Sequence, residues 1–219
     1  MCFSLSASLL AGGSLSALGV ATLKKTKSPK EIPAAAIPFF FGIQQLSEGA
    51  VWYGLTYNNE FLVRGATALY TLFSHVFWPI AIPFALRKLE PVALRRKILT
   101  VFQLLGIGIG AYLFYSLTQS PFAAHIIGNH IVYTTEANLD TLTIKILYLG
   151  VVCLSCLASS HVLARIAGVL VFIAFGVSSY FYEQAQISVW CFFAALLSAL
   201  IYFYFFNGFP RRLKGVRRA

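Results

Sequence analysis

Residues 44–52, QQLSEGAVW, lie inside an apolar run that extends from Ile32 to about Thr56. The run is long enough for one membrane-spanning helix, yet its middle holds two glutamines and the ionisable carboxyl group of Glu48. A charged group is costly in hydrocarbon, so an ionisable side chain inside a span usually marks a functional site. We therefore predict that Glu48 is the centre of a site and that the rest of the chain supplies its partners.

The composition of the 219-residue chain is that of a membrane protein. It is 58% hydrophobic and 11% charged, with a mean hydropathy of +0.76, whereas about 25% of residues are charged in soluble domains. The apolar segments leave no room for a soluble domain, so residues 1–219 are predicted to form a single transmembrane domain in the lipid bilayer. The net charge of +10 falls in short clusters between apolar runs. This is the positive-inside pattern and not that of a nucleic-acid-binding surface.

The order of apolar and basic segments predicts the topology. Basic clusters at 24–30, 87–97 and 211–218 fall on one side of the alternating spans, and Arg64 and Lys145 lie close enough to the other side to snorkel. The positive-inside rule then places the N-terminus outside and the C-terminus inside. We predict an all-α, seven-transmembrane helix bundle, with spans at about 5–23, 32–56, 61–85, 98–117, 141–159, 166–182 and 187–206.

Small residues and prolines indicate how these spans pack. A small-residue stripe and a GxxxG spacing predict close helix contacts, and prolines predict opened or bent turns in the second and third spans. Residues 118–140 form the longest outer loop, and a loop of this length is more often functional than a bare connection. The stripe is Ser4, Ser8, Gly12 and Ser16, the GxxxG is Gly106–Gly110, and the prolines are Pro33, Pro38, Pro79 and Pro83.

The depth of two ionisable residues predicts a pair inside the bundle. Glu48 lies nine residues from Tyr57, about 14 Å below the outer end of its helix, and His75 lies eleven residues from Arg64, about 16 Å deep. Their helices are sequential and joined by a short turn, so they are expected to be neighbours. A Glu48–His75 pair is suited to carrying a proton, holding a metal ion, or simply fixing the helix register by neutralising itself.

Polar residues elsewhere add candidates to this site. His130 lies in the outer loop, and Cys2 and Cys191 lie near the outer ends of their spans, where they suit a disulfide or thiolate coordination of a metal. Cys153 and Cys156 are one turn apart inside a span and are interpreted as core packing.

Several motifs resemble those of one family. They are Met1-Cys2-Phe3-Ser4, Gln44-Gln45-x-x-Glu48-Gly49-x-x-Trp52, Ser74-His75-x-x-Trp78-Pro79, His130-Ile131-x-Tyr133, Ser159-Ser160-His161 and Val189-Trp190-Cys191-Phe192-Phe193. The chain is similar over nearly its whole length to uncharacterised prokaryotic multi-pass membrane proteins that begin Met-Cys-Phe-Ser. The resemblance implies the inner membrane of a prokaryote but no activity. It groups Cys2, Glu48, His75, His130 and Cys191, all of which the predicted topology places in the outer half.

These observations predict an integral membrane protein with an embedded site for a transition metal, zinc, copper or iron, near the outer face. The metal ligands would be Glu48, His75, His130, Cys2 and Cys191, because mixed His, Cys and carboxylate ligands suit those metals. Gln44, Trp52 and Tyr133 are candidates for contacting the bound cofactor. Two alternatives stay open: a proton- or solute-coupled transporter that uses a Glu48–His75 relay, and a structural or assembly protein. Whether the chain is an enzyme is also left open.

Overall fold

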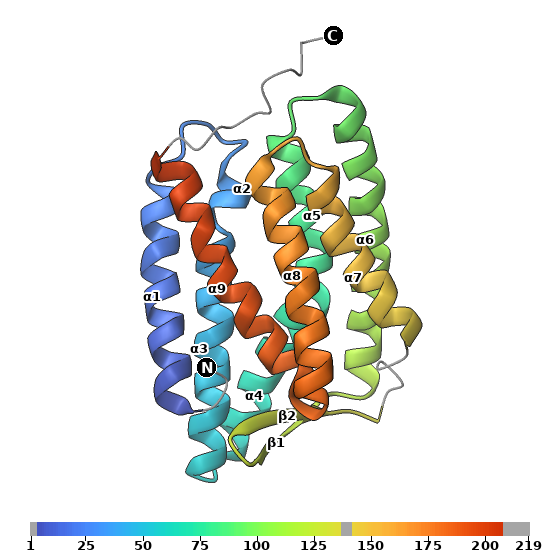
Figure 1. The fold of residues 1–219 in the computed structure, drawn as a ribbon. Helices are drawn as coiled ribbons and strands as arrows, with labels where there is room; N and C mark the ends of the chain where they lie inside the picture. The colour runs from blue at the N-terminus through green and yellow to red at the C-terminus, as the bar shows by residue number, and fades with distance from the viewer. Residues whose placement is uncertain (1–3, 137–141, 208–219) are drawn as a thin grey trace.

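A computed structural model describes residues 4–136 and 142–207. The chain folds into a bundle of long helices that run along one axis, with a β-hairpin across one end (Figure 1). The elements in order are α1 (Leu5–Leu23), α2 (Ile32–Ala35), α3 (Ile37–Thr56), α4 (Glu60–Thr71), η1 (Leu72–Phe77), α5 (Trp78–Leu89), α6 (Ala93–Gln119), β1 (Ala123–Ile127), β2 (His130–Thr134), α7 (Leu142–Ala158), α8 (Val162–Phe181), η2 (Glu183–Ala185) and α9 (Gln186–Asn207).

The helical character predicted from the sequence is confirmed, and five helical segments are long and apolar enough to cross a membrane. They are Leu5–Leu23, Glu60–Leu89, Ala93–Gln119, Val162–Phe181 and Glu183–Phe205. Helix α3 is not among them because its glutamines and Glu48 lower its hydropathy, and the apolar stretch Thr143–Ala158 is shorter. The chain is thus of the membrane-protein type, while the count of seven spans and the direction of the termini stay predictions.

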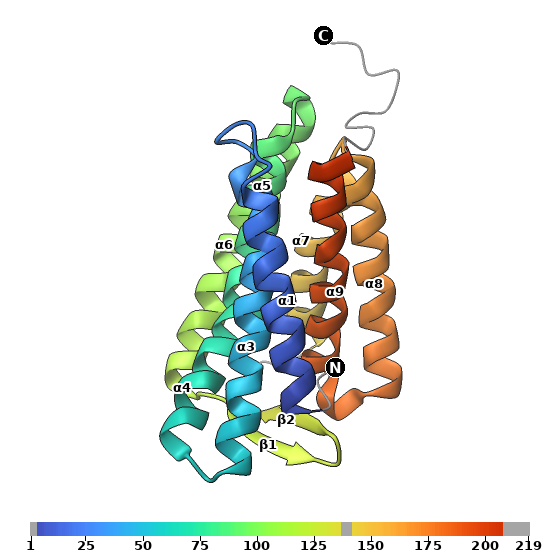
Figure 2. The ribbon, with the colours of Figure 1, turned by 90° about the vertical axis from the view of Figure 1, so that its left-hand side faces the viewer.

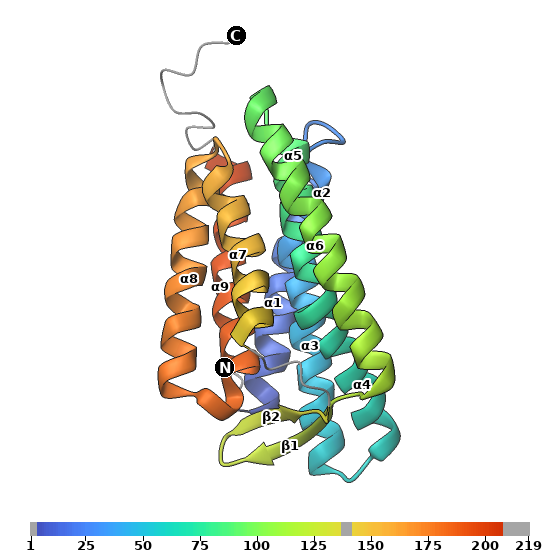
Figure 3. The same cartoon turned by 90° about the vertical axis from the view of Figure 1, so that its right-hand side faces the viewer.

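The segment predicted to be the longest outer loop contains a β-hairpin. Its strands β1 and β2 pair antiparallel, from Ala123 opposite Thr134 to Ile127 opposite His130. Gly128 in the turn has φ +60°, a conformation that glycine adopts without strain. Figures 2 and 3 show the hairpin lying across the end of the bundle formed by α1, α3 and α4. We call this end the hairpin end.

Prolines shape the second and third predicted spans. The second span is interrupted between α2 and α3, each of which begins with a proline in its first turn. In the third span, the six residues before Trp78 form a π-helix, η1. A π-helical bond to the carbonyl oxygen of Ser74 would need the N–H of residue 79, which is proline and has none. The Tyr148 hydroxyl donates to this oxygen instead, at 2.7 Å, and so ties α7 to η1.

Close contacts join the helices on both sides of this span. A Cβ atom on Gly106 of α6 would fall on the carbonyl oxygen of Pro79, so α6 and α5 touch through their backbones there. A Cβ atom on Gly12 of α1 would lie 2.8 Å from the backbone nitrogen of Leu46 in α3. Both contacts confirm the close packing predicted from the small residues.

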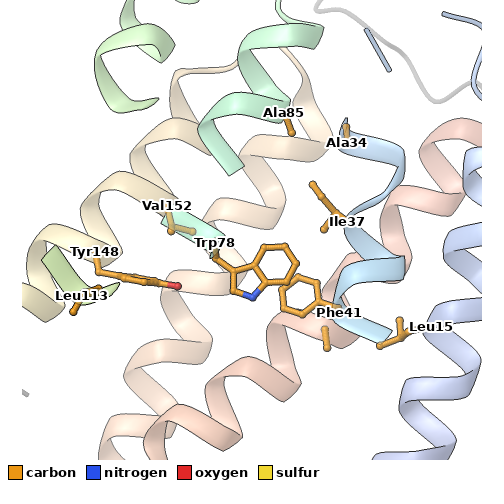
Figure 4. Packing of buried hydrophobic residues seen from close by; sticks show 10 residues of the cluster. Leu15, Ala34, Ile37, Phe41, Trp78, Ala85, Leu113, Tyr148 and Val152 are labelled. Atoms are coloured by element: carbon orange, nitrogen blue, oxygen red, sulfur yellow. The ribbon is translucent and has the colours of Figure 1, made fainter. Parts of the chain in front are cut away.

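The main hydrophobic core runs between the helices near the middle of the bundle. Figure 4 shows Trp78 lying between Tyr148 and Phe41, and the Trp78 and Phe41 rings stack with centroids 3.8 Å apart. The described Lys and Arg residues lie at the end opposite the hairpin, apart from Arg64 and Lys145. We call this the basic end.

Candidate functional site

Glu48 lies in the hairpin half of α3, and its side chain is completely buried. The hydroxyl group of Ser188 in α9 donates a hydrogen bond to Glu48 Oε1 at 2.5 Å. Ser188 is also completely buried. The carboxyl group therefore joins two helices that are 140 residues apart in the sequence.

Gln44 and Cys191 extend the site by one helical turn on each of these helices. Gln44 Oε1 accepts a hydrogen bond from Trp78 Nε1 at 2.7 Å, which connects α3 to α5. The Cys191 thiol interacts with the side chains of Gln44 and Tyr70 and lies close enough to Glu48 to interact electrostatically. Residues from α3, α4, α5 and α9 thus meet at one buried cluster, which we call the Glu48 site.

Aromatic residues close the site on the side of the hairpin. Tyr70 stacks on Tyr133 of β2, with ring centroids 4.6 Å apart and an interplanar angle of 8°. Trp52, one turn after Glu48, belongs to the same hydrophobic cluster as Tyr70, Tyr133 and Cys191. The structure therefore brings together Gln44, Glu48, Trp52, Tyr133 and Cys191, five of the residues predicted from the sequence.

Several buried polar atoms around Glu48 have no hydrogen-bond partner within the described ranges. Leaving such a group unpaired costs about 1–3 kcal/mol, and buried polar groups in native proteins are ordinarily paired with protein or water. A group of them in one half of α3 and in its neighbours α1 and α4 therefore indicates a place for water or a ligand. The atoms are Ser8 Oγ, Gln45 Nε2, Gln45 Oε1, Trp52 Nε1 and Thr67 Oγ1.

The surface at the hairpin end is hollowed beside α4. A broad depression of about 1180 Å³ is bordered by α4, the turn before it, the end of α6 and strand β1. Its wall includes the charged residues Glu60 and Arg64 and reaches the buried Thr67. Thr67 lies one turn before Tyr70, so the depression borders the helix that supplies Tyr70 to the Glu48 site.

His75 lies beside this cluster, in η1. Its Nδ1 atom is 2.8 Å from the Ser74 hydroxyl, and its ring lies 4.9 Å from that of Phe122. It lines a small cavity of about 60 Å³ together with Cys191 and Lys145. These contacts do not join the His75 ring to the Glu48 carboxyl group, so the Glu48–His75 pair stays a prediction.

His130 lies on the other face of the hairpin from Tyr133. Side chains alternate along a strand, and Val132, which shares the parity of His130, packs against Ala185 and Val189. The His130 ring contacts Tyr182 with centroids 5.3 Å apart. Burial lowers the pKa of His130 below its ordinary value, so this side chain favours its neutral form.

The predicted metal ligands are only partly assembled in the described part of the chain. Among residues 4–136 and 142–207, no group of three or more His, Cys, Asp and Glu side chains is placed to hold a metal ion. Cys2 lies outside the described residues. Cys191 is a free thiol, Cys153 is buried, and the half-buried Cys156 packs against Gly168 of α8.

A second buried carboxyl group, missed in the sequence, lies at the basic end. Glu90 is 2% exposed and accepts three hydrogen bonds, from the backbone N–H groups of Val92 and Ser160 at 3.1 and 2.8 Å and from the Ser159 hydroxyl at 3.3 Å. Next to it, His161 Nε2 donates to the Leu89 carbonyl oxygen at 3.3 Å. The other ring nitrogen lies 2.9 Å from the Tyr204 hydroxyl. We call these residues the Glu90 network.

Ser188 was also missed, although the sequence contains a signal for it. It precedes Cys191 by three residues, which places both side chains on one face of α9. Isolated hydroxyl groups are common in apolar spans. The spacing of Ser188 and Cys191 therefore indicates a site only once Glu48 is known to lie against the same face of α9.

The fold and this site define a class: a helical protein of the membrane type with a polar cluster buried in its bundle. The chain belongs to the family of unknown function DUF6629, which it matches over residues 1–214. Membership of an uncharacterised family is therefore confirmed, whereas the prokaryotic origin stays a prediction. No curated protein and no solved structure matches the chain.

Proposed function

We propose that this chain is a multi-pass membrane protein that binds a small polar solute at the Glu48 site, reached from the hairpin end. The observation that carries the proposal is the set of buried polar atoms without partners around Glu48. They include a donor on Trp52 and both donor and acceptor atoms on Gln45. Such a set matches a ligand that both donates and accepts hydrogen bonds.

A transition-metal ion is the second candidate ligand. One observation favours it: the Cys191 thiol lies near the Glu48 carboxyl group and shares a small cavity with His75. Zinc, copper or iron would take Glu48 and Cys191 as ligands, with Cys2, His75 and His130 as the further predicted donors. When bound, the ion would supply Lewis-acid or redox chemistry, and Gln44, Trp52 and Tyr133 would orient whatever it binds.

Binding is favoured over transport by what lies between the Glu48 site and the basic end. An apolar cavity occupies that region, and the hydrogen-bonded Glu90 network lies beyond it. A polar solute that crossed the bundle would lose its hydrogen bonds along this path. The orientation with the hairpin end outside, in the cell membrane of a prokaryote, is part of the same proposal and rests on the basic end lying inside.

The test compares Glu48→Gln with the matched control Glu183→Gln, because Glu183 is exposed at the start of η2 and borders none of the cavities described above. Native mass spectrometry and elemental analysis of detergent-purified protein should find a small molecule or a metal ion, about one per chain, in the wild type and the control only. Where nothing co-purifies, a solute screen by thermal shift replaces this readout. Equal occupancy in all three proteins, or equal thermal shifts with every solute, would refute the proposed site.

A further inference from the structure

The depression of about 1180 Å³ beside α4 has a polar part and an apolar part. Figure 3 shows the end of α6 beside α4, next to the hairpin. The polar side chains of Asn58, Glu60 and Arg64 line the depression at the tip of the bundle. Leu69 and Leu72 line it five and eight residues after Arg64, about 8 and 12 Å further toward the middle of the bundle. Charged groups thus lie at one end of the depression and an apolar wall at the other.

Exposed tyrosines on both sides of the depression indicate the depth at which it lies in a membrane. Tyr57, in the turn before α4, is 63% exposed, and Tyr115, near the end of α6, is 64% exposed. Tyrosine is enriched where the lipid head groups meet the hydrocarbon core. Arg64 therefore lies at the level of the head groups. Leu69 and Leu72 lie within the depth of one leaflet's acyl chains, which is about 15 Å, half of the hydrocarbon core.

Glu60 and Arg64 are both available to a ligand. They are four residues apart on α4, with the glutamate first, the order that favours an ion pair on a helix. Even so, neither side chain forms an ion pair or a hydrogen bond with any residue that the structure describes. A guanidinium group binds phosphate through two parallel hydrogen bonds, and a carboxylate accepts hydrogen bonds from an ammonium group. The two side chains together are complementary to a head group that carries both charges.

We infer that this depression binds one phospholipid with an ethanolamine head group. Arg64 binds its phosphate, Glu60 accepts from its ammonium group, and an acyl chain lies against Leu69, Leu72 and Phe114. A choline head group has the same charges but no N–H to donate to Glu60, and a glycerol head group has no cation. The inference does not depend on a solute or a metal ion at the Glu48 site, because it uses none of the residues assigned to that site.

Native mass spectrometry tests the choice of lipid. Delipidated protein in detergent is titrated with phosphatidylethanolamine, phosphatidylcholine or phosphatidylglycerol that carry identical acyl chains. One phosphatidylethanolamine should bind about tenfold more tightly than either of the other lipids, the difference expected for one hydrogen bond to a charged group. Equal affinities, or tighter binding of phosphatidylglycerol, would overturn the inference. A dimer of the chain that forms only without lipid would instead assign the depression to a second copy.

Charge variants test the head-group contacts in the same titration. Arg64→Gln should weaken binding of phosphatidylethanolamine by about tenfold, and Glu60→Gln should remove the preference for phosphatidylethanolamine over phosphatidylcholine. Both side chains are exposed, so the variants keep the fold. The matched controls Arg96→Gln and Glu183→Gln change exposed residues outside the depression and should bind as the wild type does. If Arg64→Gln and Glu60→Gln also bind as the wild type does, the lipid does not lie in this depression.

A bulky side chain in the apolar part tests the position of the acyl chain. Ala68 is exposed and lines the depression, so Ala68→Trp should occupy the space of the chain and weaken binding of phosphatidylethanolamine. Ala111→Trp, on an exposed face of α6 outside the depression, is the control and should leave binding unchanged. If the two tryptophan variants bind the lipid equally well, the acyl chain does not lie against α4, and this part of the inference is wrong.

Discussion

Two carboxyl groups are buried in this bundle, and their surroundings are opposite. Glu90, at the basic end, accepts hydrogen bonds from two backbone N–H groups and one hydroxyl group of neighbouring turns. Glu48, in the hairpin half, bonds to Ser188 and lies among glutamine, tryptophan and threonine side chains whose polar atoms lack partners in the described ranges. Glu90 completes a hydrogen-bond network, whereas the hydrogen-bond network around Glu48 is incomplete within the described residues.

This difference separates a structural role from a functional one. A carboxyl group that accepts every nearby donor fixes the turns that carry those donors, so Glu90 holds the ends of α5, α7 and α8 together. Buried polar atoms without partners lower stability, and they persist in native proteins mainly where water or a ligand completes them. Substitutions at the Glu48 site and in the Glu90 network should therefore change the free energy of unfolding by amounts that differ in sign as well as in size.

The largest expected effect is that of Glu90→Gln. The amide can offer one acceptor oxygen, and its NH₂ group would face donors, so we expect a loss of about 3 kcal/mol in the free energy of unfolding. Glu48→Gln should cost less than about 1 kcal/mol, because the Ser188 hydroxyl can rotate to accept from the new amide. Unfolding of the detergent-solubilised protein, followed by circular dichroism, measures both values.

An exposed glutamate provides the control for the Glu90→Gln and Glu48→Gln variants. Glu183→Gln changes an exposed residue and should have no measurable effect. If Glu48→Gln destabilises the protein as much as Glu90→Gln does, the Glu48 site is structural.

A change of opposite sign is expected for Gln45→Leu. Gln45 is completely buried, and both of its amide atoms lack partners in the described part of the chain. Replacing them with an apolar group of similar size should raise the free energy of unfolding by about 1 kcal/mol and weaken solute binding. Ser159→Ala, which removes a donor from Glu90, should lower the free energy of unfolding by a similar amount. A loss of stability in Gln45→Leu would mean that its amide is already satisfied in the ligand-free protein.

Tyr204→Phe probes the edge of the Glu90 network. It removes the hydrogen bond between the Tyr204 hydroxyl and His161 Nδ1 and should cost about 1 kcal/mol without affecting a ligand at Glu48. Tyr180→Phe is the matched control, since Tyr180 is 82% exposed. Thermal unfolding of both variants, with and without the solute that stabilises the wild type, separates the two regions. A loss of solute binding in Tyr204→Phe would show that they are coupled.

How far the sequence predicts each region depends on the range of the interactions involved. Hydropathy and charge clusters predict the helices because these signals are local, and Glu48 stands out because its own span is apolar. Glu90 does not stand out, because it follows Arg87 and Lys88 and resembles an ordinary loop residue. Its burial depends on Ser159 and Ser160, which are about 70 residues away, and no local pattern contains that contact.

The hairpin and η1 were missed for related physical reasons. The alternation in β1 and β2 is short, and a two-stranded sheet of this size is stable only when it packs on something else. Here Ile131 and Tyr133 pack against Trp52 and Tyr70. The π-helix depends on the Tyr148 hydroxyl, which takes the place of the missing proline N–H, so the position of His75 could not follow from helical spacing alone.

The smallest expected effect is a pH dependence of the free energy of unfolding that arises from His130 at the hairpin end. Burial lowers the pKa of His130 in the folded protein, so the unfolded chain binds the proton more readily. Stability should be unaffected above pH about 6.5, the ordinary pKa of histidine. It should fall slightly as the pH drops below that value and level off once the folded form is protonated too. His130→Gln should remove this slope, whereas His125→Gln, at an exposed position of β1, should keep it. If the slope persists in His130→Gln, the acid sensitivity arises elsewhere in the chain, and the hairpin over the Glu48 site is not where protonation is sensed.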